Sequence, residues 1–228
     1  MKNITISRNL LYFAALVLFT GCSKLQGTVD PTSTIPARSA TSDSYQPVTK
    51  GSYWKYAYTK DGVTDTATTT ITGLTIAYNN TPYSEAATTY KQHNFPDVTS
   101  YLSSGSHVYK ALSIAKSDTS NLYFFNDTTA LNNTWTAKVN NSGIVNGQQA
   151  RYVGDIVEQN ISLTVEGKTY TGVTHSKIYL QYLQGDNSYT TTETYDFFMV
   201  QGIGAIEIFT STSAGSNSSR ALISYLIK

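Results

Sequence analysis

The chain has 228 residues, with 16 Lys and Arg against 15 Asp and Glu, a formal net charge of +1. A balance this close to neutrality offers no electrostatic attraction for nucleic acid, so we expect no nucleic-acid partner. A single cysteine is present, and no disulfide can form within the chain. The fold must therefore depend on a hydrophobic core, which a chain of this length can build.

The first 21 residues have the order of a secretory signal peptide. Lys2 and Arg8 supply positive charge before an apolar run, Leu10 to Phe19. The small residues Thr20 and Gly21 follow the run. Ten apolar residues are too few to cross a membrane, since a spanning helix needs about 20. We therefore predict that residues 1–21 are a signal peptide that is removed on export.

Cys22 follows this segment directly, and the arrangement resembles the lipobox of bacterial lipoproteins. The lipobox pattern prefers Leu three places before the cysteine, where this chain has Phe19. The resemblance implies that Cys22 carries lipid and that its fatty chains anchor the protein to a membrane, for which two chains suffice. In similar lipoproteins an Asp directly after the cysteine retains the protein in the inner membrane, and an acidic run there is common in proteins that reach the cell surface. This chain has Ser23 and Lys24 at these positions. The resemblance therefore implies the periplasmic face of the outer membrane.

Residues 22–49 are predicted to be the acylated cysteine and a flexible tether. Pro31, Pro36 and Pro47 are spread among Ser, Thr and Ala, and no apolar periodicity is present. Residues 50–228 are predicted to form one domain.

The predicted domain alternates polar and apolar residues with a period of two. Trp54, Tyr56 and Tyr58 share one face of a predicted strand over residues 52–60, and residues 161–166 and 177–182 alternate in the same way. Turn-forming residues separate such runs near positions 61, 79, 104, 141, 167 and 185. The sequence therefore predicts an all-β fold, a single antiparallel up-and-down sheet that is closed or strongly curved into a barrel or half-barrel.

Two segments need separate interpretation. Residues 107–116 fit either a helix that plugs the mouth of the sheet or a strand, and the neighbouring strands favour a strand. Residues 220–228 are apolar on both faces. Because an exposed edge strand of this kind would promote aggregation, we predict that the last strand is central or covered.

Four short segments together resemble exported Bacteroidota lipoproteins. They are Gly51-Ser52-Tyr53-Trp54-Lys55-Tyr56 after Pro47, residues 132–136, residues 165–173, and residues 197–206 with Gly202-Ile203-Gly204. The resemblance covers residues 47–228. It implies a curved β-domain of lipocalin-like or lipoprotein-carrier-like shape, and it supplies no catalytic residues to carry over.

No catalytic or metal-binding pattern stands out in the sequence. His93, His107 and His175 are widely separated, and neither a His-Glu-x-x-His nor a Gly-x-Ser-x-Gly motif occurs. His175 has the strand parity of Lys177, so we expect it to face water. Gly202 and Gly204 predict a bend or bulge in the sheet. We predict a protein that is not an enzyme and has no cofactor or metal.

The 18 tyrosines fit two roles, cross-strand packing or the lining of a ligand groove, and packing is favoured. Our leading hypothesis is a non-catalytic lipoprotein that binds a small apolar or amphipathic ligand within its curved sheet. The alternative is a structural or protein-interaction subunit of an outer-membrane complex. An enzyme, the third hypothesis, would require one of the histidines to meet a carboxylate in a cleft.

Overall fold

The computed structural model describes residues 44–105, 107–115 and 119–228, which form strands and no helix. Residues 1–21 and Cys22 lie outside the described part. The strands are β1 (Tyr53–Lys60), β2 (Val63–Tyr78), β3 (Thr81–Tyr90), β4 (Val98–Ser104), β5 (Val108–Ile114), β6 (Thr119–Asn126), β7 (Thr134–Lys138), β8 (Ile144–Val145), β9 (Gln148–Val165), β10 (Lys168–Leu183), β11 (Tyr189–Val200), β12 (Gly204–Thr212) and β13 (Asn217–Leu226). None of the described segments is a helix of the length and hydropathy that crossing a membrane requires.

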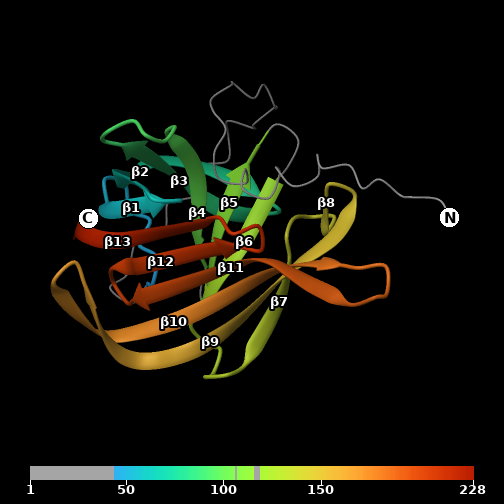
Figure 1. The fold of residues 1–228 in the computed structure, drawn as a ribbon. Coiled ribbons are helices and arrows are strands. Elements are labelled where there is room, and N and C mark those ends of the chain that lie inside the picture. Colours follow the sequence, from blue (N-terminus) through green and yellow to red (C-terminus); the bar gives the residue numbers. More distant parts are fainter. Residues whose placement is uncertain (1–43, 106, 116–118) are drawn as a thin grey trace.

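All thirteen strands belong to one antiparallel arrangement that curves into a barrel shape (Figure 1). From β1 to β6 and from β9 to β13, strands that follow each other in the chain are paired, and the order across the sheet is β6-β5-β4-β3-β2-β1-β13-β12-β11-β10-β9-β7, with β8 paired to β9. The first and last strands, β1 and β13, pair with each other from Tyr53 to Lys60. The predicted all-β, up-and-down and strongly curved sheet is confirmed.

The two segments with open interpretations are both strands within this sheet. Residues 108–114 form β5 between β4 and β6, so the strand interpretation is confirmed. The last strand, β13, lies between β1 and β12, as its two apolar faces predict. Leu222 is fully buried, whereas Tyr225 and Leu226 at the end of the strand are partly exposed.

Tight turns with left-handed backbone connect the long strands. Asp61 and Gly62 join β1 to β2, and Glu166 and Gly167 join β9 to β10, each with positive φ at both positions. Two consecutive positive φ values are characteristic of a type I′ turn, whose twist matches that of the strands it joins. Where Gly202 and Gly204 predict a bend or bulge in the sheet, the structure has a turn at residues 201–203 that joins β11 to β12, with positive φ at both glycines.

Large aromatic side chains fill the described interior of the barrel. Trp54, Tyr56 and Tyr58 point inward from β1, as their alternation predicts, with exposed fractions of 2%, 6% and 2%. Trp54 Nε1 donates a hydrogen bond of 2.6 Å to the Ile203 carbonyl, and the Tyr56 hydroxyl donates one of 2.9 Å to the Ala205 carbonyl. These bonds satisfy the polar ends of the buried rings and fix the β11–β12 turn.

The packed body begins before the boundary that the sequence predicts at residue 50. Gln46 and Pro47 are buried, and the Tyr45 ring lies 4.6 Å from that of Phe125, measured between centroids. The Ser44 carbonyl accepts a hydrogen bond of 2.9 Å from the amide of Gly202. Residues 44–49, assigned to the tether on their polar composition, therefore belong to the folded body, because Tyr45 finds an aromatic pocket.

Gly154 of β9 lies beneath the ring of Trp135. A Cβ atom at this position would overlap the Trp135 ring and would lie 2.8 Å from Cδ1 of Ile178. We expect Gly154→Ala to lower the free energy of unfolding by about 1–3 kcal/mol, because the added methyl group would force tightly packed neighbouring atoms out of their preferred positions. Urea denaturation measures the change. Gly185→Ala is the control, since a Cβ there meets no atom within 4 Å, and equal effects from the two would contradict this account.

Candidate functional site

The sheet has two unpaired edges, β6 and β7, and a seam separates them. A backbone hydrogen bond of 2.7 Å crosses it from the Asn121 amide to the Val139 carbonyl, and the rings of Tyr123 and Trp135 meet across it at 5.5 Å. Behind the seam, Ser176 Oγ of β10 donates a hydrogen bond of 2.7 Å to the Phe124 carbonyl. The barrel is therefore joined here mainly by side chains in place of a strand ladder.

A cleft of about 290 Å³ opens at one end of this seam. Its first wall is formed by Lys110 of β5 with Asn121 and Tyr123 of β6. The opposite wall is formed by Ala137 and Lys138 of β7 and by Asn140 and Asn141 of the following loop, and Asn79 of the β2–β3 turn completes the rim. The lining contains two lysines and no Asp or Glu, so the cleft is positively charged.

Several of the amides that line the cleft are used to build it. Asn140 Nδ2 donates to the Ile144 carbonyl at 2.8 Å, and Asn140 Oδ1 accepts from the Gly143 amide at 2.8 Å. Asn141 Nδ2 donates to Asn79 Oδ1 at 2.8 Å, which joins the loop to the β2–β3 turn. Both side chains therefore fix the shape of the rim.

Asn121 and the two lysines of the cleft have fewer such contacts. Asn121 Oδ1 accepts a hydrogen bond of 2.9 Å from the buried Tyr83 hydroxyl, which turns the amide into a defined orientation. Lys110 Nζ lies 5.8 Å from the centre of the Tyr123 ring, within range of a cation–π interaction. Within the described part of the chain, the salt bridges include neither Lys110 nor Lys138.

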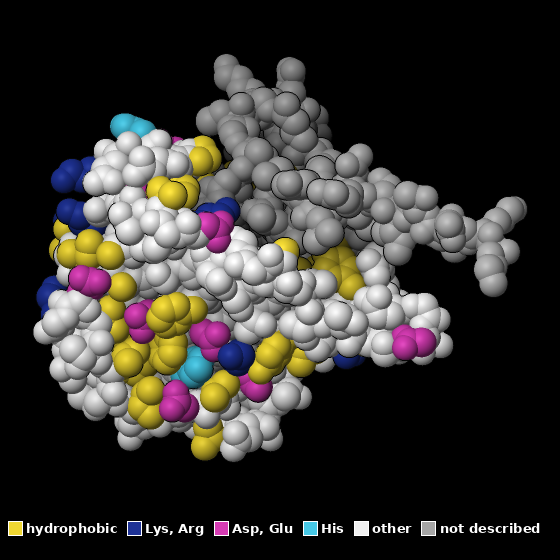
Figure 2. All heavy atoms as spheres, in the orientation of Figure 1, with side chains coloured by type: hydrophobic (Ala, Val, Ile, Leu, Met, Phe, Trp, Pro, Cys, Tyr) yellow, Lys and Arg dark blue, Asp and Glu magenta, His cyan; other side chains and the backbone are white. Residues whose placement is uncertain are grey.

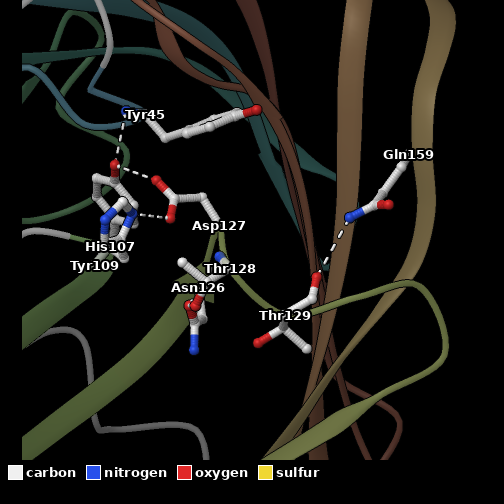
Figure 3. Close-up of polar contacts among 8 residues, drawn as sticks. All are labelled: Tyr45, His107, Tyr109, Asn126, Asp127, Thr128, Thr129 and Gln159. Atoms are coloured by element: carbon white, nitrogen blue, oxygen red, sulfur yellow. Dashed lines mark hydrogen bonds and ion pairs between the residues drawn. The ribbon is translucent and has the colours of Figure 1, made fainter.

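His107 lies near the other end of β6, in a hydrogen-bond network (Figure 3). His107 Nδ1 and Asp127 Oδ1 are 2.7 Å apart, and the Tyr109 hydroxyl donates to Asp127 Oδ2 at 3.0 Å. The Tyr109 oxygen in turn accepts a hydrogen bond of 3.3 Å from the Tyr45 amide. Burial, reinforced by Asp127, raises the pKa of Tyr109 to about 12, so its hydroxyl stays protonated. The network connects the segment before β1 to the β5–β6 hairpin.

His175 of β10 lies between two carboxylates. Its Nε2 is 2.7 Å from Asp196 Oδ1 and its Nδ1 is 3.1 Å from Glu158 Oε2, while its ring stacks on Phe198 at 4.2 Å. Burial lowers the pKa of His175, but the hydrogen bonds to Asp196 and Glu158 outweigh burial and raise it. The expectation that His175 faces water is wrong, because neighbouring side chains of β9 and β11 cover the imidazole, leaving 9% of the residue exposed.

The three histidines do not converge on a common site. His93 follows β3 and His107 precedes β5, so the two lie beyond opposite ends of β4, and His175 belongs to β10. Among the described residues, no group of three or more His, Cys, Asp or Glu is arranged to hold a metal ion.

Sequence reasoning missed Glu193, a buried acid on the inward face of β11. It shares the strand parity of the buried Tyr195, Phe197 and Met199. Burial raises the pKa of Glu193 to about 7, against the opposing effects of a hydrogen bond from Tyr195 and the charge of Lys60. The position of Glu193 in the same alternation as these apolar residues is the signal in the sequence that predicts its burial. Sequence reasoning also missed Lys110, Asn121 and Lys138, because the β5–β6 hairpin that holds the first two meets β7, which holds Lys138, only at the seam.

Comparison with known proteins found two solved structures of similar shape. One is a protein from Bacteroides fragilis described as exported, with a YmcC-like fold, at 9% identity and a TM-score of 0.47. The other, from Parabacteroides distasonis, is described as a lipoprotein, at 12% identity and a TM-score of 0.48. Each match covers 81% of this chain and 99% of the other. No family model matches the chain, and no curated protein matches it either. Both likenesses are too distant to assign a function.

The ion pairs of His175 predict a pH-dependent stability. A raised pKa means that protonated His175 stabilises the folded state below the unfolded pKa of about 6.5, and that this contribution is lost as pH rises through the folded value. We expect His175→Gln to cost about 1–2 kcal/mol at pH 6 and less at pH 9, measured by urea denaturation.

The same measurement on Asp196→Asn and on the double variant isolates the pair. The pH dependence of the His175→Gln effect should weaken in the Asp196→Asn background. An effect of His175→Gln that is the same at both pH values would contradict the assignment.

Proposed function

We propose that this chain is an exported, non-catalytic binding protein, anchored to the membrane through lipid on Cys22, that recognises a polar ligand at the seam cleft. The lipobox-like order of residues 10–22 supports the anchor. The proposed address is the periplasmic face of the outer membrane, on the identity of Ser23 and Lys24.

The contrast between interior and seam carries this proposal. An apolar ligand within the sheet would need free space there. Large side chains occupy the described interior, and they include Trp54, Tyr83, Tyr90 and Phe125, of which no more than 2% is exposed. The seam, by contrast, has a cleft of about 290 Å³ with charged and amide groups on its walls. The geometry therefore favours a polar ligand at the seam over an apolar ligand inside the barrel.

The separate placement of the histidines supports a non-catalytic role. His107 and Asp127 form a pair, but the remaining contact of that carboxylate is the Tyr109 hydroxyl, which burial keeps protonated. His175 is held between two carboxylates and an aromatic ring, with little room for a substrate.

A role as a subunit of a larger complex is the second candidate. Phe209 of β12 is 41% exposed and meets the Phe198 ring edge-on at 6.2 Å, next to the His175 ion pairs. Figure 2 shows hydrophobic and charged side chains gathered on this face of the barrel. The other exposed large apolar residues are distributed over separate strands and loops, so we rank this role below ligand binding.

Lipid attachment is tested by Cys22→Ser in the native host. We expect the wild type to incorporate an alkyne-labelled palmitate and to fractionate with the outer membrane, and Cys22→Ser to lose the label and the membrane association. Ser23→Ala is the control and should retain both. A labelled or membrane-bound Cys22→Ser protein would argue against this anchor.

The filled interior is tested by mass spectrometry of material extracted from the purified Cys22→Ser chain, which lacks the covalent lipid. We expect no lipid at a stoichiometric level, because large aromatic side chains, almost wholly buried, occupy the described core. One mole of a defined lipid per mole of protein would restore the apolar-ligand hypothesis.

A further inference from the structure

We propose that the seam cleft binds a small organic anion, a phosphate or carboxylate attached to a hydroxyl-bearing group of about the size of a monosaccharide. This inference rests on the proposed function, since it names the class of ligand for the same cleft. It is argued from the hydrogen-bonding groups that the cleft leaves available, from its charge and from its size.

The available groups of the cleft are donors. Lys110 and Lys138 contribute ammonium groups, which donate and do not accept. The Asn121 carboxamide has its oxygen engaged by the Tyr83 hydroxyl, so the NH₂ group is what it offers to the cleft. A ligand that satisfies three donors must be rich in acceptor oxygens.

The charge of the cleft selects among such ligands. Its lining holds two lysines and no carboxylate, so a neutral ligand would leave both ammonium charges uncompensated. A phosphate or carboxylate supplies both the acceptors and the charge, and hydrogen bonds between ammonium and anion are stronger than neutral ones. The Tyr123 ring beneath Lys110 holds that ammonium group at the wall.

The volume of the cleft sets the size of the ligand. About 290 Å³ is roughly ten times the space that a water occupies in the liquid, so a bare phosphate would leave much of it unfilled. It is also at the small end of ligand pockets, which span roughly 300–1,000 Å³. A single sugar-sized group attached to the anion fits this range, with the Asn79–Asn141 pair at the rim beside it.

The experiment is isothermal titration of the full acylated chain in neutral detergent micelles with glucose 6-phosphate, inorganic phosphate and glucose. We expect glucose 6-phosphate to bind at least five-fold more tightly than glucose, and its affinity to fall as salt is raised. Lys110→Gln and Lys138→Gln should each weaken glucose 6-phosphate binding at least five-fold. Asn121→Asp, which keeps an acceptor for Tyr83 and replaces the free donor by a negative oxygen, should abolish it.

Lys91→Gln is the matched control. Lys91 follows β3 at the end opposite the β2–β3 turn that holds Asn79, so the substitution removes the same charge at a distance from the cleft. Binding should be unchanged in this variant. An equal loss in Lys91→Gln and Lys110→Gln would show a general charge effect and would overturn the site.

The anion has two sources, a free metabolite or a lipid headgroup, and a second assay separates them. The Cys22→Ser chain is sedimented with vesicles of phosphatidylglycerol or of phosphatidylcholine. Binding to phosphatidylglycerol that Lys110→Gln and Lys138→Gln reduce supports a headgroup, whereas binding of glucose 6-phosphate without vesicle binding supports a free ligand. If neither assay detects binding, the inference is overturned.

The failure of this inference is distinguishable from failure of the proposed function. Glucose that binds as tightly as glucose 6-phosphate, with loss of both in Asn121→Asp, would remove the requirement for an anion but leave ligand binding at the cleft intact. Lipid attachment at Cys22 and the absence of lipid from the interior have readouts of their own.

Discussion

The structure depends on the pairing of the first strand with the last. Because β1 and β13 are hydrogen-bonded along the whole of β1, the first and last strands are joined inside the sheet, and the two unpaired edges fall between them in the chain, at β6 and β7. An unpaired edge exposes backbone donors and acceptors that must find other partners. Here the backbone bond from Asn121 to Val139 and the ring contact of Tyr123 with Trp135 join the edges. The position of the cleft follows from this topology.

The second constraint is the packing of the interior. Tyrosine serves this barrel as a core residue, since its ring fills space and several of the buried hydroxyls find a partner, as Tyr56 does at Ala205 and Tyr152 does at Ser120. Desolvation raises the pKa of these buried tyrosines, which keeps their hydroxyls neutral. Packing thereby explains the abundance of tyrosine, which is the interpretation favoured from the sequence.

His175 shows that strand parity alone does not decide whether a side chain is exposed. Strand parity placed His175 on the face of Lys177, and the two do share the carboxylate of Asp196. Parity carries no information on how closely neighbouring strands cover that face, and Glu158 and Phe198 enclose the imidazole. The result is a group of charges that spans β9, β10 and β11 and stabilises the sheet from outside.

The sequence by itself determined the fold class, the central position of the last strand and the inward face of Trp54, Tyr56 and Tyr58, and it favoured a strand over a helix for residues 107–116. These features depend on alternation and turn residues, which act over a few neighbouring positions. Only the tertiary structure decided that residues 44–49 join the folded body, that aromatic rings fill the described interior and that Lys110, Asn121 and Lys138 face one cleft. Those features depend on contacts between strands that are distant in the chain, and the pairing register that creates them has no short-range signature in the sequence.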